Sequence, residues 1–131
     1  MNRTVLFSGR FDPPHIGHWI SILRLADKFK KVKVVVLDYP ERRFNIQYVL
    51  QIFDELTGRW PFDRKVEVMS NSDHFGKITK KALEKYEFDV YAAGNMVVLN
   101  HINSLGIKCM YVDRAFDFEA HRYIPKWEEK E

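Results

Sequence analysis

The chain has 131 residues, of which 46% are hydrophobic and 30% are charged, and its formal net charge is +3. These values are typical of one globular domain, 1–131, that can bury a core without disulfides or structural metals. No long polar or repetitive tract indicates disorder, and the basic residues are dispersed rather than clustered. We therefore expect a single domain with no nucleic-acid partner.

Targeting signals and membrane spans are not expected either. No apolar run approaches the ~18 residues that span a bilayer, and the first predicted strand begins almost at once, without a signal-peptide pattern. The single cysteine, Cys109, lies in the apolar stretch 107–112, where a buried structural thiol is expected. The sequence thus predicts a soluble cytoplasmic protein with no membrane partner.

Strands and helices alternate along the predicted chain. Bounded apolar runs predict strands, and apolar residues at a 3.6-residue period predict helices. In chain order the predictions are a strand at 4–7, a helix from 19 to about 28, a strand at 32–37, a helix at 46–56, a strand at 65–69, a helix at 76–86, a strand at 88–93, a helix at 96–105 and a strand at 107–112. Gly58 is expected in the left-handed conformation after the second helix, and Gly106 closes the fourth.

This alternation with short connections predicts an α/β fold, with a five-stranded parallel sheet and helices on both of its faces. The sequence pattern of the tail 114–131 predicts its secondary structure less clearly than that of any other segment. Pro125 interrupts any helix there, and 128–131 is expected to be a frayed, solvated end.

The segment 9–18, between the first strand and the first helix, carries the most informative chemistry. It lies at the carboxyl end of the predicted sheet, where ligands bind in such folds. Gly9 and Gly17 let a ligand approach the backbone. His15 and His18 lie on one face of a helix N-terminus, whose free amides favour phosphate, so two imidazoles can donate hydrogen bonds to one phosphate group. Without the flanking glycines and prolines, a pair of surface or capping histidines would be the simpler interpretation.

The residues at 9–12 (Gly-Arg-Phe-Asp) and 15–18 (His-Ile-Gly-His) resemble the H-x-G-H pattern of the cytidylyltransferase-like nucleotidyltransferase superfamily. Three further features match in register. The segment 41–46 resembles the E-R-x-x-x-I segment of nicotinamide mononucleotide adenylyltransferases, 94–98 resembles their G-N-x-x-V segment, and Arg114 follows the fifth strand. The resemblance covers residues 3 to about 114. It implies a Rossmann-like fold and in-line transfer of AMP or CMP from ATP or CTP to a phosphorylated small molecule, with Mg²⁺ and release of pyrophosphate.

The resemblance also implies site residues. The catalytic group is expected to be His15, His18, Arg10 and Arg114. The nucleotide-binding group is expected to be Gly9, Phe11, Asp12, Gly17, Arg42, Gly94, Asn95, His121 and Arg122, and no protein ligand of a metal is predicted. Arg43 is an alternative to Arg42, since the alignment of this segment with the family pattern can be displaced by one residue. Asn95 could also act as a helix N-cap. Many members are dimers, which suggests a homodimer.

Two questions stay open in the sequence. Residues 9–15 favour the adenylyltransferases, whereas the chain length and the short join after the second strand favour the glycerol-3-phosphate cytidylyltransferases. In addition, no hydroxyl lies between Arg114 and Arg122, where the family places a Ser/Thr motif that holds the triphosphate. His121 and Arg122 could replace those donors, or Asp117 could cap a helix. The alternative function is therefore a catalytically inactive nucleotide-binding sensor of the same fold.

Overall fold

The computed structural model describes residues 3–112, 116–117, 122–123 and 127–130. The strands are β1 (Thr4–Gly9), β2 (Lys31–Leu37), β3 (Val66–Asn71), β4 (Val90–Ala93), β5 (Cys109–Val112), β6 (Phe116–Asp117), β7 (Arg122–Tyr123) and β8 (Trp127–Lys130). The helices are α1 (Ile16–Lys28), α2 (Ile46–Thr57), α3 (Lys80–Glu84) and α4 (Met96–Ser104). None of the helices in these described ranges is long and apolar enough to cross a membrane.

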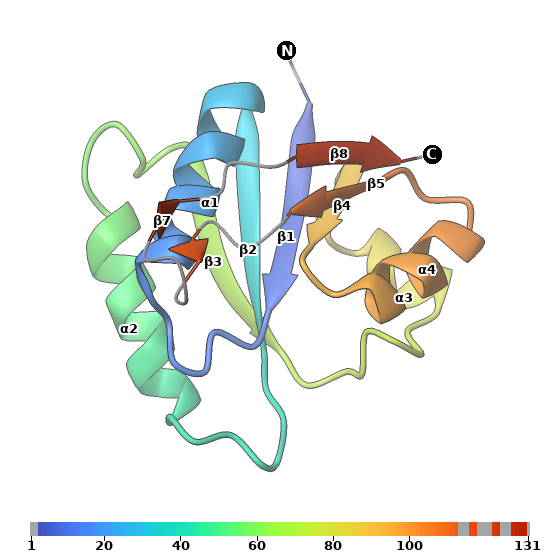
Figure 1. Ribbon diagram of the computed structural model, residues 1–131, viewed down its shortest axis with the longest axis horizontal. Coiled ribbons are helices and arrows are strands. Elements are labelled where there is room, and N and C mark those ends of the chain that lie inside the picture. Colours follow the sequence, from blue (N-terminus) through green and yellow to red (C-terminus); the bar gives the residue numbers. More distant parts are fainter. Residues whose placement is uncertain (1–2, 113–115, 118–121, 124–126, 131) are drawn as a thin grey trace.

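The main sheet has the strand order β3-β2-β1-β4-β5-β8, and its first five strands are parallel (Figure 1). This confirms the predicted α/β fold and its five-stranded parallel sheet. From β1 the chain adds β2 and β3 on one side, and then β4 and β5 on the other. The direction of winding therefore reverses between β1 and β4, and ligands bind at such a reversal, beyond the carboxyl ends of the strands.

Helices cover both faces of the sheet, as Figure 1 shows. On one face, α1 and α2 bury Ile22 and Phe53 against alternate strand residues such as Val34. On the other face, α3 and α4 bury Leu83 and Ile102 against the residues that point the opposite way. Because successive strand residues face opposite sides, a central strand covered on both faces must be apolar throughout, which explains the continuous run in β2.

The end of the chain differs from the expected frayed tail. Residues 127–130 form β8, which pairs antiparallel with β5 from Cys109↔Lys130 to Val112↔Trp127. Without this partner the outer edge of β5 would leave backbone donors and acceptors unpaired, so pairing outweighs the charged composition of the segment. Asp117 also lies in a strand, β6, which pairs with β7, and it is not the helix cap that was considered.

One helix starts later than predicted because of a local cap, and one of two glycines differs from its predicted conformation. The predicted helix 76–86 shortens to α3, since the Thr79 hydroxyl accepts a hydrogen bond from the amide of Ala82 and starts the helix there. The prediction for Gly58 was wrong, because its φ is −76° rather than left-handed. A Cβ at Gly58 would instead lie 2.7 Å from the Asp54 carbonyl oxygen, so the position needs a small residue for space. Gly106, with φ +83°, closes α4 as predicted.

Candidate active site

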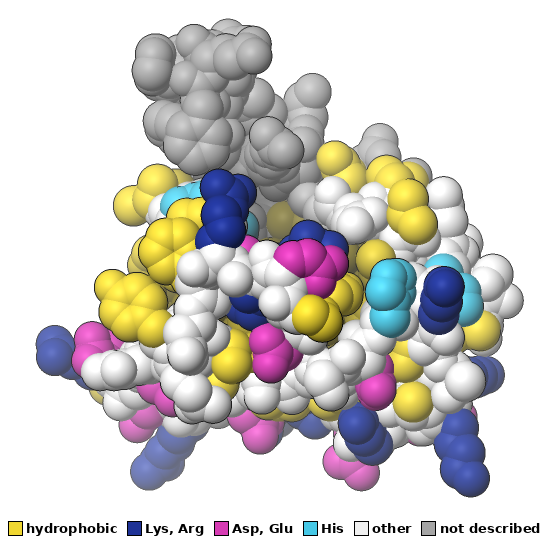
Figure 2. Space-filling model, turned by 90° about the horizontal axis from the view of Figure 1, so that it is seen from below, with side chains coloured by type: hydrophobic (Ala, Val, Ile, Leu, Met, Phe, Trp, Pro, Cys, Tyr) yellow, Lys and Arg dark blue, Asp and Glu magenta, His cyan; other side chains and the backbone are white. Residues whose placement is uncertain are grey.

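A cleft of about 820 Å³ opens at the carboxyl ends of the parallel strands. This volume lies within the range of about 300–1,000 Å³ that is usual for small-molecule sites. Figure 2 looks onto this end of the molecule, where basic, acidic and histidine side chains lie among apolar ones. The predicted site residues that line the cleft are Gly9, Arg10, Phe11, Asp12, His15, Gly17, His18, Gly94 and Asn95.

The two histidines of the 9–18 segment form a capping box at the start of α1. Nδ1 of His15 accepts a hydrogen bond from the amide of Gly17 at 3.0 Å, and Nδ1 of His18 accepts one from the amide of His15 at 3.1 Å. Their rings stack with centroids 3.7 Å apart and an interplanar angle of 21°. Both histidines therefore cap the helix, and both also line the cleft.

The capping geometry determines which ring nitrogen carries the proton. A neutral imidazole has one donor and one acceptor nitrogen, and Nδ1 is the acceptor in both rings, so Nε2 is the donor. Burial, and then the neighbouring His15, lowers the pKa of His18 from 6.5 to about 3. At neutral pH His18 is therefore uncharged, and its single N–H lies on Nε2.

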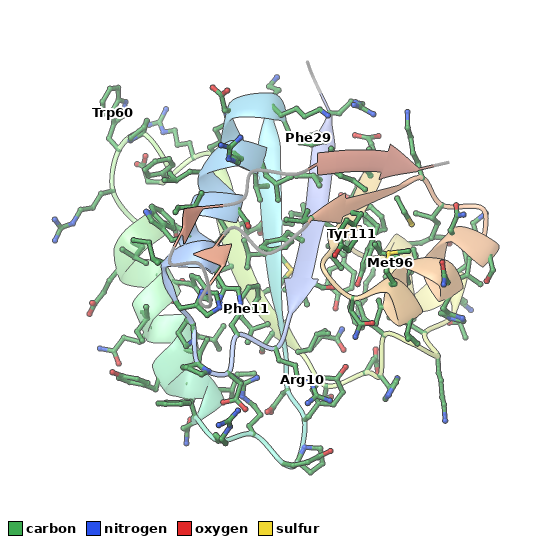
Figure 3. All side chains as sticks on the ribbon, viewed as in Figure 1. Arg10, Phe11, Phe29, Trp60, Met96 and Tyr111 are labelled. Carbon is green, nitrogen blue, oxygen red and sulfur yellow. The ribbon has the colours of Figure 1, made fainter. Side chains whose placement is uncertain are left out.

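Phe11 supports this pair from the core side of the cleft. Its ring is 3% exposed and contacts the His18 ring edge-on, with centroids 4.7 Å apart. A Cβ at Gly9 would lie 3.0 Å from the Phe11 ring, so Gly9 makes room for it. Phe11 has a φ of +49°, in the left-handed region that non-glycine residues seldom adopt. Figure 3 shows Phe11 near the start of α1 and Arg10 in the loop that follows β1.

Asp12 joins this loop to the loop before α2. Its carboxylate accepts hydrogen bonds from the amides of Arg43 at 2.8 Å and Phe44 at 2.7 Å. The bond from the Arg43 amide is the main cause that lowers the pKa of Asp12 below its usual value. The exposed carboxylate is thus held ionised and is occupied by protein amides.

The two neighbouring arginines, Arg42 and Arg43, make different contacts. The Arg42 guanidinium donates to four backbone carbonyls, those of Arg10, Phe11, Leu37 and Phe44. Among the described residues that line the cleft, Arg43 is present and Arg42 is not. Of the two arginines, Arg43, the alternative left open by the sequence, is thus the one that borders the cleft, whereas the Arg42 guanidinium is occupied by backbone carbonyls.

The opposite wall is formed where β4 meets α4. A Cβ at Gly94 would lie 2.9 Å from the carbonyl oxygen of Val112, so the close approach of β5 requires glycine. The Asn95 side chain caps α4 by accepting from the amides of Val97 at 3.0 Å and Val98 at 3.4 Å. The predicted N-cap is confirmed, and both residues also border the cleft.

Three predicted residues cannot be placed at the cleft. Arg114 and His121 lie outside the described residues, and only the backbone of Arg122, in β7, is described. Conversely, the sequence interpretation missed Tyr39 and His74, which line the cleft. The Arg10 guanidinium lies 4.3 Å from the Tyr39 ring centroid, and the Tyr39 and His74 rings meet edge-on at 5.9 Å. Their positions just past β2 and β3 were the signal that could have identified them.

Comparisons with known proteins agree with this architecture. A phosphopantetheine adenylyltransferase from Natranaerobius thermophilus is 50% identical over 40 residues, which cover 30% of this chain and 25% of that protein. A structure of a bifunctional NMN adenylyltransferase/ADP ribose pyrophosphatase from Francisella tularensis, complexed with AMP and a Mn ion, matches with a TM-score of 0.64 and 18% identity. A second structure of that bifunctional protein matches with a TM-score of 0.65 and 19% identity.

Each of these two matches covers 92% of this chain and 40% of the solved chain, so the chain spans less than half the length of these relatives. At such identities the solved structures establish the shared Rossmann-like fold. The sequence profile described as cytidylyltransferase-like matches residues 6–120, which is most of the chain. The chain therefore belongs to the cytidylyltransferase-like family.

Proposed function

We propose that the protein transfers a nucleoside monophosphate from ATP or CTP to a phosphorylated small molecule, with release of pyrophosphate. The observation that carries the proposal is the stacked pair of His15 and His18 in the cleft, with Nδ1 of each ring engaged in capping, so that the proton of each neutral ring lies on Nε2. An acceptor phosphate oxygen attacks the α-phosphorus, one P–O bond forms, and the bond to pyrophosphate breaks.

Positioning and electrostatics supply the catalysis in this proposal. The two imidazoles and Arg10, which all line the cleft, would surround the place where negative charge develops on the phosphate oxygens. No covalent enzyme intermediate is required, since the reactants only have to be held in line. Arg114, which lies outside the described residues, belongs to the proposed catalytic group on the basis of the resemblance alone.

We also propose that Mg²⁺ accompanies the triphosphate. Mg²⁺ in such sites is usually held by substrate phosphates together with one or two carboxylates and waters. Within the part of the chain that the structure describes, two carboxylates line the cleft, those of Asp12 and Glu41, and both oxygens of Asp12 accept backbone amides. Among the described residues, no three His, Cys, Asp or Glu side chains gather into a group that could hold a metal ion. Glu41 is thus the candidate carboxylate for a metal that the nucleotide brings, and the metal would neutralise phosphate charge.

The first experiment asks whether pyrophosphate is released. Purified protein is incubated with ATP or CTP, Mg²⁺ and one phosphorylated acceptor at a time, beginning with 4′-phosphopantetheine, nicotinamide mononucleotide and glycerol 3-phosphate. ATP is the first candidate, because the relatives named above are adenylyltransferases. Pyrophosphate release that depends on the acceptor supports a transferase. Thermal stabilisation by a triphosphate without pyrophosphate release from any acceptor would instead support the nucleotide sensor, which the altered segment 117–122 suggests.

His18→Ala provides the matched mutational test. We expect turnover to fall by at least about 10², because one hydrogen-bond donor to the developing charge is lost. His101→Gln serves as the control, since His101 lies on α4 and bonds the carbonyl of Ile78, away from the cleft. Turnover close to wild type in a folded His18→Ala variant would remove the histidine from the mechanism.

A further inference from the structure

Two loops that border the cleft are joined by hydrogen bonds that run in both directions. Asp12, in the loop between β1 and α1, accepts from the amides of Arg43 and Phe44 in the loop before α2. Arg42, in the second loop, donates back to the carbonyls of Arg10 and Phe11 in the first loop. We refer to Asp12 and Arg42 with these contacts as the loop clasp.

Arg42 is the centre of the clasp because one guanidinium reaches three segments. Nη1 donates to the carbonyl of Arg10 at 2.6 Å and to that of Leu37, at the end of β2, at 2.9 Å. Nη2 donates to Phe11 at 3.3 Å, and Nε donates to Phe44 at 3.0 Å. Only a planar fork with several donors can make this set of contacts, and a lysine ammonium could keep only part of it.

The clasp bears directly on the geometry of the histidine pair. It holds the backbone at Arg10 and Phe11, where Phe11 adopts its positive φ of +49°. Such a conformation persists only when surrounding contacts enforce it. The Phe11 ring then packs edge-on against His18, with centroids 4.7 Å apart. A shift of this backbone would therefore move the Phe11 ring, which packs against His18.

We propose that Arg42 is a positioning residue that holds the histidine-bearing loop in its active geometry, while Arg43 is the cation that meets the substrate phosphates. The inference rests on the proposed transferase function for its kinetic readout, but not for its structural one. It reverses the role implied by the resemblance, in which Arg42 contacts the nucleotide. Arg43 fits that role, because it is exposed and lines the cleft, and the structure gives no hydrogen bond of its guanidinium among the described residues.

The kinetic test uses substitutions that keep the positive charge. Arg42→Lys is expected to lower kcat by about 10- to 100-fold, since a small misplacement of catalytic groups has effects of that size, while the KM for triphosphate and acceptor stays within a few-fold. Arg43→Lys is expected to be mild, and Arg43→Ala is expected to raise the KM of one substrate by about 10-fold with little change in kcat. Arg59→Lys, at an exposed arginine beyond α2 and outside the cleft, is the control.

The structural test does not depend on turnover. Nitrogen-15 NMR of the imidazoles reports which nitrogen of His15 and His18 carries the proton. We expect wild type, Arg43→Ala and Arg59→Lys to show the Nε2–H form of both rings, and Arg42→Lys to show a mixture of tautomers or broadened signals. If no pyrophosphate forms in any variant, the proposed function fails, whereas this spectrum still decides the role of Arg42.

Two outcomes would overturn the inference. Arg42→Lys with wild-type kcat and wild-type imidazole spectra would show that the clasp does not position the loop. Arg42→Lys that raises KM alone, as Arg43→Ala does, would return Arg42 to substrate binding. If Arg42→Lys does not fold, Asp12→Asn opens the clasp from the other side, because the two backbone amides bond to separate oxygens of Asp12 and the NH2 group of asparagine cannot accept a hydrogen bond. The same kcat loss supports the inference, and unchanged kcat with unchanged spectra refutes it.

Discussion

At the scale of single residues, the site depends on histidines that serve the backbone and the cleft at once. Nδ1 of each ring accepts a backbone amide, and this contact leaves the proton on Nε2. The lowered pKa of His18 keeps that ring neutral near pH 7. A neutral donor avoids the cost of burying a charge before the substrate arrives. In the proposed reaction, the helix cap would therefore prepare the two donors for the phosphate oxygens.

The substitution Phe11→Leu should distinguish the contact of Phe11 with His18, which affects kcat, from its packing in the core, which affects stability. We expect kcat to fall by about 10-fold, because the edge-on contact with His18 is lost and the ring can shift. Stability should fall by about 1–2 kcal/mol, since buried aromatic contacts with His18 and Phe53 disappear. Steady-state kinetics and urea unfolding measure the two effects.

Phe29→Leu is the matched control for that substitution. Phe29 is 1% exposed, belongs to the same core cluster, and lies at the opposite end of the molecule from Arg10 and Phe11 (Figure 3). Its replacement should lower stability to a similar degree and leave kcat unchanged. Equal kcat values for the two variants would contradict the supporting role of Phe11.

At the scale of secondary-structure elements, two helix N-termini face the cleft from different strands. α1 begins after β1, and α4 begins after β4, and these strands are neighbours at the point where the winding of the sheet reverses. Both helices are capped by side chains that line the cleft, His15 and Asn95. Two positive helix ends at one opening suit an anionic ligand such as a triphosphate.

Asn95→Ala should weaken both the start of α4 and the proposed triphosphate binding in the cleft beside it. We expect a loss of about 1 kcal/mol in stability, as is usual for removing an N-cap, and a raised KM for the triphosphate. Asn95→Asp restores an acceptor for the cap and should recover stability. Thr79→Ala removes the cap of α3 away from the cleft and should change stability without changing KM. Identical kinetics for Asn95→Ala and wild type would argue against a role at the site.

At the scale of the whole molecule, the half-buried imidazole of His18 links global stability to pH. The folded-state pKa of His18, about 3, lies below its ordinary value of 6.5. Between these values the unfolded chain binds more protons than the folded chain. The contribution of His18 to stability is therefore complete above pH 6.5 and is lost as the pH falls toward 3.

We expect the free energy of unfolding of wild type to fall with decreasing pH more steeply than that of His18→Gln across this window. One group of this kind changes stability by at most about 1.4 kcal/mol per pH unit. Urea titrations of both proteins at several pH values between about 4 and about 7 measure the difference. Asp12 and the other carboxylates titrate in both proteins, so their effects cancel. Parallel pH profiles would show that His18 is not buried as a neutral group.

The sequence by itself determined the parallel sheet, the order of its elements and the main cleft segment. These features depend on local patterns: the apolar run of β2, the period of α2, and the glycines and histidines at 9–18. Neighbours in sequence are enough to produce them, because the side-chain periods of strands and helices are local properties. Family membership followed from the same segment and agrees with the profile match over residues 6–120.

Only the tertiary structure decided which of two adjacent arginines faces the cleft, since Arg42 and Arg43 are distinguished by backbone carbonyls more than 30 positions away. Tyr39 and His74 meet because β2 and β3 end side by side, and Gly94 must be glycine because β5 passes close to it. The edge strand β8 has no apolar alternation and exists through pairing with β5. Contacts between segments distant in the chain set each of these features, and no local pattern encodes such contacts.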